Sequence, residues 1–211
     1  MSETLTGTYA KDERVERIAF VDIETTGLSA RLHEVIEVGI VLVEQRVTQG
    51  AVTVTVLSEH EWRLIPERIE SADPVALRIN KYSPARWETA RPQKECLSEI
   101  VAMLTELKPF PGIPDSQPFN AGIVGGHCVH FDLGFLYRSA ERHDLDYSPH
   151  KYIVDTYSVA RKTFAKEPKQ KFSLNALCER LDVTNKNAHS ALSDIRATVD
   201  VYRKLMNHKN S

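Results

Sequence analysis

Residues 18–27 read IAFVDIETTG, and this stretch decides which fold the chain is expected to adopt. A short apolar run with branched side chains is typical of a buried strand, and Asp22 is the charge inside it. A buried carboxylate is costly unless a cation or several hydrogen-bond donors compensate it. Side chains two positions apart on a strand leave the same face, so Asp22 and Glu24 are expected about 7 Å apart on one side.

Two carboxylates that approach one point repel each other, so they require raised pKa values or a bound metal ion. Oxygen ligands suit a hard cation such as Mg²⁺ or Mn²⁺ better than zinc. For this motif alone a structural alternative stays open, in which Asp22 ends the strand and its side chain caps the turn at Thr25-Thr26-Gly27.

Outward from this strand, the chain changes from strand patterns to alternating strand and helix patterns. Further strands are expected over 35–43, 52–57, 121–124 and 152–154. Helices are expected over 93–107, from Phe131, from Asp155-Thr156, from Ser173 and over 192–206, and Ser83-Pro84 is a further helix start signal. The pattern predicts an α/β domain whose mixed sheet has three antiparallel strands and then parallel strands, flanked by helices.

The length of 211 residues favours one domain. We expect a polar N-terminal tail over 1–17, the domain over 18–206 and a short C-terminal tail over 207–211. Pro109, Pro111, Pro114 and Pro118 predict a stiff surface loop within that domain rather than a boundary.

The net charge of −2 on its own argues against a nucleic-acid partner. The charge is unevenly distributed, however, because residues 1–150 carry −8 and residues 151–211 carry +6. Five basic residues fall in one stretch: Arg161, Lys162, Lys166, Lys169 and Lys171. That stretch is either a solvated loop or a patch that contacts phosphates.

Composition also bears on where the protein resides. No apolar stretch approaches the roughly 20 residues of a membrane span, and the N-terminus lacks the apolar core of a signal peptide. Cys96, Cys128 and Cys178 form no CxxC pair, which favours reduced thiols. We therefore expect a soluble cytoplasmic protein with no membrane partner and no structural disulfide.

Two later motifs add two acidic residues and a histidine to the carboxylate pair of the first motif. Residues 124–132 read VGGHCVHFD and place Asp132 in the first turn of a helix, and residues 189–194 read HSALSD and carry His189 and Asp194. The ordered set resembles the DEDDh branch of the DnaQ-like 3′→5′ exonucleases, which includes proofreading subunits, RNase T and oligoribonuclease. The resemblance covers about Ile18 to Met206 and implies an RNase H-like fold.

By this resemblance, Asp22, Glu24, Asp132 and Asp194 hold two divalent metal ions, Mg²⁺ or Mn²⁺, with Asp22 bridging them. His189 is the general base that deprotonates the attacking water. Elementary chemistry agrees, since paired ions about 3.5–4 Å apart can stabilise both the attacking and the leaving oxygen of a phosphoryl displacement.

The resemblance also implies contacts to the terminal nucleotide. These residues are Thr25, Gly27, Leu28, Asn80, His127 and Phe131, and Leu28 would be an apolar wedge against the terminal base. Leu28 as loop packing and Phe131 as core are structural alternatives. Many relatives have Asn where this chain has Cys128, which leaves substrate preference open. A zinc site at His127, Cys128 and His130 is rejected, because three ligands within four positions cannot surround a tetrahedral metal.

These motifs favour a metal-dependent exonuclease that releases nucleoside 5′-monophosphates from single-stranded 3′ ends of DNA or RNA. Three alternatives stay open: an exoribonuclease of the RNase T or oligoribonuclease type, a polymerase-associated proofreading subunit that acts mainly by binding, and a glycoside hydrolase that uses paired carboxylates. A homodimer and an association with a polymerase both stay open.

Overall fold

The computed structural model describes residues 13–107, 121–149, 152–167 and 171–208. Its centre is a five-stranded sheet with the strand order β3-β2-β1-β4-β5. The strands are β1 (Glu13–Thr25), β2 (Val35–Thr48), β3 (Ala51–Arg63), β4 (Ile123–Gly126) and β5 (Ile153–Asp155). The first three pair antiparallel, whereas β4 runs parallel to β1 and β5 runs parallel to β4. The mixed sheet expected from the sequence is confirmed.

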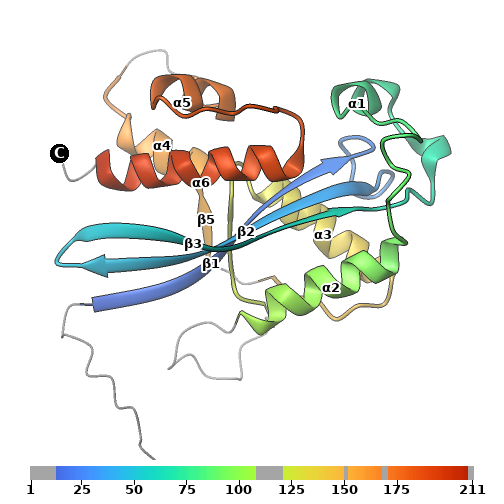
Figure 1. Cartoon of the computed structure of the whole chain (residues 1–211), viewed down its shortest axis with the longest axis horizontal. Coiled ribbons are helices and arrows are strands. Elements are labelled where there is room, and N and C mark those ends of the chain that lie inside the picture. The colour runs from blue at the N-terminus through green and yellow to red at the C-terminus, as the bar shows by residue number, and fades with distance from the viewer. Residues whose placement is uncertain (1–12, 108–120, 150–151, 168–170, 209–211) are drawn as a thin grey trace, which may run out of the picture.

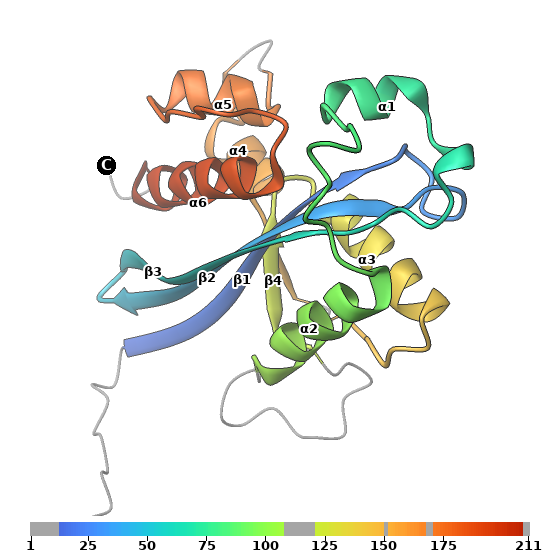
Figure 2. The same cartoon turned by 45° about the vertical axis from the view of Figure 1, so that its right-hand side comes forward.

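Helices cover both faces of this sheet (Figures 1 and 2). They are α1 (Pro74–Ile79), α2 (Gln93–Glu106), α3 (His130–Arg142), α4 (Thr156–Thr163), α5 (Leu174–Arg180) and α6 (Ala191–His208), with a 3₁₀ turn at Ile69–Ser71. The long helix α6 lies along one face with α4 and α5 beside it, and α2 and α3 lie on the opposite face. No helix among the described residues is long and apolar enough to cross a membrane.

The alternation of side chains along β1 divides the core into two layers. Ala19, Val21 and Ile23 pack toward α2 and α3, whereas Ile18 and Phe20 pack toward α6. Because side chains alternate along a strand, Asp22 and Glu24 continue the second series. The two carboxylates therefore face the beginning of α6, and the apolar positions before them fix that orientation.

The first strand begins earlier than the sequence predicts. The expected strand starts at Ile18, but β1 starts at Glu13, so the expected tail over 1–17 overlaps it. Glu16 is buried there, and its carboxylate accepts a hydrogen bond from Gln45 on β2. Polar side chains that satisfy each other across two strands give no apolar pattern, which explains the difference. The four prolines expected to form a stiff connector lie outside the described residues.

Two segments after β3 differ from the sequence expectation, which has a helix start at Ser83-Pro84 and a loop at Asp73-Pro74. Asp73-Pro74 starts α1, and the Asp73 carboxylate accepts the backbone N–H of Val75. Ser83-Pro84 gives only a turn, in which the Trp87 N–H donates to the Ser83 carbonyl. The helix predicted there is wrong, because the Trp87 indole is buried and donates to the Ile36 carbonyl, which fixes the segment against β2.

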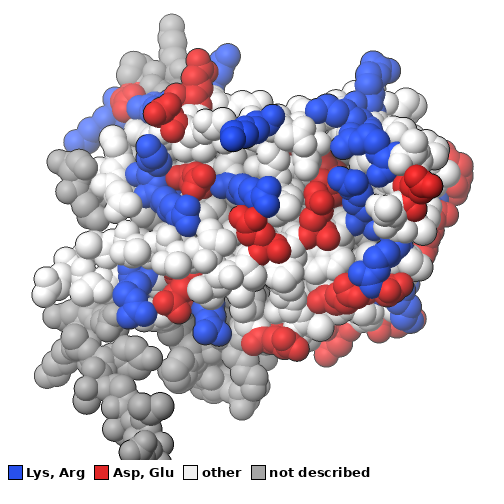
Figure 3. Space-filling view, in the orientation of Figure 1, with Lys and Arg blue, Asp and Glu red and all other residues white. Residues whose placement is uncertain are grey.

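Charged side chains of both signs are interspersed over the face of the molecule drawn in Figure 3. Within the basic stretch, Arg161 and Lys162 end α4, and both are exposed, as are Lys166 and Lys171. Lys169 lies outside the described residues. The exposed part of this stretch fits either interpretation made from the sequence.

Candidate active site

Two antiparallel strands supply the floor of the site. Asp22 on β1 lies opposite Gly39 on β2, and Glu24 lies opposite Glu37. The register between the strands shifts directly after Glu24, where the chain leaves the regular pairing. The carboxylate pair therefore lies at the end of β1, where the strand gives way to a loop.

Asp132 comes to the same place from α3. It lies in the first turn of that helix, is 4 % exposed, and its Oδ1 accepts the backbone N–H of Ile23 at 3.1 Å. Ile23 is the residue between Asp22 and Glu24, so this hydrogen bond fixes the start of α3 beside the carboxylate pair. Motifs separated by 109 positions thus meet at one point.

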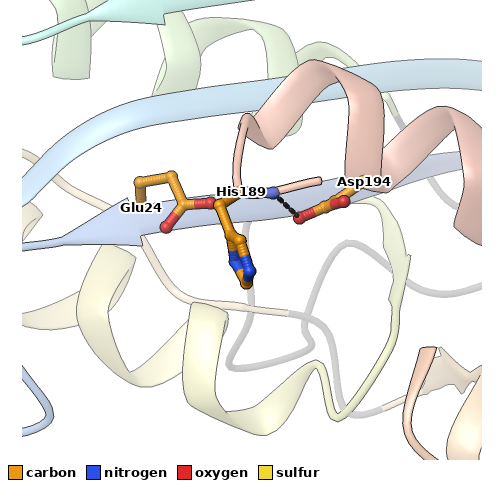
Figure 4. Close-up of side chains that lie close together, drawn as sticks. All are labelled: Glu24, His189 and Asp194. Atoms are coloured by element: carbon orange, nitrogen blue, oxygen red, sulfur yellow. Dashed lines mark hydrogen bonds between the residues drawn. The ribbon is translucent and has the colours of Figure 1, made fainter. Parts of the chain in front are cut away.

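His189 and Asp194 join the site from the loop before α6 and from its first turn (Figure 4). One ligand atom each from Glu24, His189 and Asp194 lie within 4.8 Å of one another. The backbone N–H of His189 donates to Asp194 Oδ2 at 3.0 Å, and Asn185 Nδ2 donates to Asp194 Oδ1 at 2.5 Å. The loop is thereby tied to the helix, while the His189 side chain stays exposed.

The carboxyl groups of the site have perturbed pKa values. Burial, together with the charges of Asp132 and Glu24, raises the pKa of Asp22 well above its usual range. Burial raises the pKa of Asp132 to about 8, and burial and the charge of Asp194 raise the pKa of Glu24 to about 8. Such groups ionise near neutral pH only when a cation offsets their repulsion. The donor set, carboxylate oxygens with one imidazole, fits a hard divalent cation.

The apolar side chains expected to contact a nucleotide are free to do so. Leu28 is 82 % exposed, so it is not packed within its loop. Phe131 is 40 % exposed and its ring lies 4.9 Å from that of Phe135. Phe131 is therefore a surface side chain supported by a buried neighbour rather than part of the core.

The turn after the carboxylate pair is stabilised by hydrogen bonds from buried side chains. Asn80 is 6 % exposed, and its amide donates to the Thr25 carbonyl at 2.8 Å. The Thr25 hydroxyl donates to the Gly27 carbonyl, and a Cβ at Gly27 would lie 2.5 Å from the His33 ring. The side chains of Asn80 and Thr25 thus shape the turn from within.

The second motif contains a backbone conformation that explains its composition. Cys128 has a φ of +58°, in the left-handed region that Asn and Gly adopt most readily. Its N–H donates to Asp155 Oδ1 at 2.8 Å. This backbone conformation favours Asn, the residue that the family resemblance leads us to expect at this position. The preceding His127 bonds the Thr156 hydroxyl through Nδ1 at 2.9 Å, and burial lowers the pKa of His127.

Two residues of the site were missed in the sequence. Asn185 holds Asp194, and Glu37 lies buried beside the carboxylate pair and accepts hydrogen bonds from Ser190 and Ala191. Asp22 was singled out because it is a charge inside an apolar run. Glu37 is likewise a charge inside the apolar run VIEVGIVLV, so the same signal could have identified it. No local sequence signal marks Asn185.

A mixed sheet of this order, flanked by helices, is an RNase H-like fold. Comparison with known proteins narrows this fold class. The family described as Exonuclease, RNase T type, matches residues 117–202. Ribonuclease T of Shewanella frigidimarina is 27 % identical over 189 residues, which cover 89 % of this chain and 80 % of that protein. Ribonuclease T of Hahella chejuensis is 26 % identical over 89 % of this chain and 82 % of that protein.

Solved structures of exonuclease I show the same fold. Escherichia coli exonuclease I in complex with a dT13 oligonucleotide superposes with a TM-score of 0.64 at 18 % identity, over 89 % of this chain and 40 % of that one. Its zinc-bound form has a TM-score of 0.64 at 16 % identity, over 92 % and 41 %. This chain thus spans about two fifths of the exonuclease I chains. The family match and the ribonuclease T relatives support a DnaQ-like 3′→5′ exonuclease.

Proposed function

We propose that this protein removes nucleotides one at a time from the 3′ ends of single-stranded DNA or RNA and releases nucleoside 5′-monophosphates. The observation that carries the proposal is the convergence of Glu24, His189 and Asp194 within 4.8 Å. Asp22 and Asp132 flank this cluster, and the four carboxylates would hold two divalent ions, Mg²⁺ or Mn²⁺. Two such ions stabilise the attacking and the leaving oxygen of an in-line phosphoryl displacement.

In this proposal His189 takes the proton of the attacking water. An imidazole changes charge near neutral pH, which suits a general base. The water oxygen bonds to the phosphorus of the terminal nucleotide, the bond from phosphorus to the preceding 3′ oxygen breaks, and that oxygen takes up a proton. The hydrogen bond from the His189 N–H to Asp194 fixes the backbone and leaves the ring exposed for this transfer.

The terminal nucleotide would lie over the loop that follows β1. Leu28 and Phe131 offer exposed apolar surface to a base, and the backbone at Thr25 and Gly27 allows close approach. His127 would contact the same nucleotide. The exposed basic side chains between Arg161 and Lys171 would contact phosphates further along the strand. Such local contacts need no overall positive charge.

Both DNA and RNA are supported as substrates. The curated relatives are named ribonuclease T, whereas the exonuclease I structures contain DNA oligonucleotides. An exoribonuclease of the RNase T type is therefore the second candidate. Recognition of a 2′-hydroxyl depends on a few contacts near the terminal sugar.

The test is an assay of the purified protein on matched single-stranded DNA, single-stranded RNA and short RNA oligomers labelled at the 5′ end. We expect ladders that shorten from the 3′ end in Mg²⁺ or Mn²⁺ and full-length substrate in EDTA. A substrate with a blocked 3′ end is the control. Degradation that survives EDTA would refute the metal mechanism.

A second measurement addresses partners. The proposal includes activity of the chain without a polymerase, either as a monomer or as a homodimer. Size-exclusion chromatography followed by assay of each fraction would show which species is active. Activity found only after addition of a polymerase would instead support an obligate proofreading subunit.

A further inference from the structure

Glu37 occupies a position next to the proposed site that the reaction itself does not use. It is 1 % exposed, and it lies on β2 directly opposite Glu24. Cross-strand partners project from the same face of a sheet, so the Glu37 side chain points toward α6, as Asp22 and Glu24 do. A third carboxylate is thus buried where two others already repel each other.

The contacts of Glu37 are with the start of α6. Its Oε1 accepts the backbone N–H of Ala191 at 2.9 Å and the Ser190 hydroxyl at 3.1 Å, and its Oε2 lies 3.7 Å from Arg63 Nε. Ala191 is the first residue of α6. The first N–H groups of a helix have no partner within the helix, and a negative charge is favourable there. Glu37 therefore caps α6 from a neighbouring strand.

Gly39, two residues further along β2, also contacts the start of α6. A Cβ at Gly39 would lie 2.6 Å from the carbonyl carbon of Ala191 and from the nitrogen of Leu192. These are backbone atoms, so α6 would have to move away from the sheet to make room. The start of α6 therefore rests directly on the backbone opposite Asp22.

The position of α6 decides the position of two proposed active-site residues. Asp194 lies in its first turn, and the His189 N–H is bonded to Asp194. We propose that Glu37, assisted by Gly39, is a positioning residue that sets the start of α6 and so holds His189 and Asp194 against the carboxylates of β1. This role rests on the proposed function, because it concerns the same site.

The test compares Glu37→Gln, which keeps an oxygen acceptor at nearly the same volume, with Glu37→Leu, which removes it. The readouts are amide hydrogen exchange at Ala191 and over 185–190, Mn²⁺ affinity by calorimetry, and kcat and KM on an oligonucleotide. For Glu37→Leu we expect loss of protection at Ala191, a fall of about 10- to 100-fold in Mn²⁺ affinity and in kcat, and a KM within about threefold. Glu37→Gln should stay close to the wild type in all three.

A second variant keeps the inference testable if Glu37→Leu fails to fold. Gly39→Ala should weaken Mn²⁺ binding about tenfold by displacing α6. Gly134→Ala is its matched control, because a Cβ at Gly134 on α3 meets open space. Unchanged Mn²⁺ affinity and Ala191 exchange in Glu37→Leu, or in Gly39→Ala where the former is unfolded, would overturn the inference. Damage in Glu37→Gln equal to that in Glu37→Leu would also overturn it.

Failure of the proposed function is a separate outcome. A wild-type protein that degrades no nucleic acid would refute the exonuclease proposal. Hydrogen exchange at Ala191 and Mn²⁺ affinity would still decide the role of Glu37, because neither measurement depends on substrate turnover.

Discussion

Both ends of the β1–β2 strand pair pack against α6, but they differ in whether their buried polar side chains have hydrogen-bond partners. At the far end, Glu16 lies opposite Gln45, whose amide donates to Glu16 Oε2, and Tyr202 on α6 donates to Gln45 Oε1. At the site end, Glu24 lies opposite Glu37. Among the described residues, no side chain donates a hydrogen bond to Asp22 or Glu24.

The difference shows where this fold gives up stability for chemistry. A satisfied polar network stabilises the strands it joins, whereas repelling carboxylates destabilise the protein until a cation arrives. Between the two ends, Ile18 and Phe20 pack against α6 in the ordinary way. The apolar middle of the strand pair therefore holds together an end that would not be stable by itself.

The largest expected effect comes from removing a carboxylate at the site end. Asp22→Asn or Asp132→Asn should lower kcat/KM on a single-stranded oligonucleotide at least about a thousandfold, because charge stabilisation by bound ions is worth several kcal/mol. The measurement is 3′-end degradation in Mg²⁺. Asp144→Asn, an exposed residue beyond α3 whose left-handed backbone Asn tolerates, is the matched control. Unchanged degradation in both site variants would contradict the assignment.

Loss of the proposed base should come next. His189→Ala is expected to lower kcat by about 10²–10⁴-fold, which is the usual contribution of a general base. Steady-state kinetics over a range of pH would measure it, with His208→Ala at the other end of α6 as the control. A fall in Mn²⁺ affinity without a change in kcat at saturating metal would instead make His189 a ligand.

The repulsion at the site end predicts an unusual dependence of stability on pH. The pKa values of Glu24 and Asp132 are raised to about 8 in the folded protein, so the folded state holds these protons more tightly than the unfolded chain. Stability of the metal-free protein should be greatest at low pH and fall as the pH rises through about 8. Melting temperatures in EDTA would show this fall, and added Mn²⁺ should reverse it. A metal-free protein that becomes more stable over this range would contradict the prediction.

A substitution at the far end of the strand pair should change the stability of the protein and leave its activity unchanged. Tyr202→Phe removes the hydroxyl that donates to Gln45 and should cost about 1 kcal/mol of unfolding free energy. Chemical denaturation measures the loss, and Mn²⁺ affinity and kcat should stay unchanged. An effect on catalysis would mean that the two ends are coupled through α6.

The smallest effect is expected at Cys128. Its left-handed backbone favours Asn, so Cys128→Asn should raise the unfolding free energy by up to about 1 kcal/mol. Denaturation midpoints would measure the gain. Val129→Ala, which removes buried apolar surface next to it, should destabilise the protein and serves as a contrast. A destabilised Cys128→Asn would show that the thiol makes a contact of its own.

Much of the fold and of the candidate site follows from local sequence patterns. The alternation in IAFVDIETTG predicts a strand with two carboxylates on one face, and the caps at Asp155 and Ser173 mark true helix starts. The ordered motifs around Asp132, His189 and Asp194 carry the resemblance to the DnaQ-like exonucleases. Each of these signals is local, because propensity, capping and alternation depend on residues a few positions apart.

Other features came from the tertiary structure. Asn80 was expected at the nucleotide, but its buried amide supports the Thr25 carbonyl 55 positions away. Ser83-Pro84 starts no helix because the Trp87 indole is bonded to Ile36. In both cases a partner distant in the sequence competes with the local preference, and the burial of that contact decides the outcome.

The sequence by itself determined which residues are candidates for the chemistry, because an acidic pair in a buried strand and a histidine five residues before an aspartate are local features of the chain. Only the tertiary structure decided how that chemistry is held. Glu37 caps a helix whose first residue follows 154 positions later. Contacts over such separations depend on strand register and on the packing of α6, which no local pattern encodes.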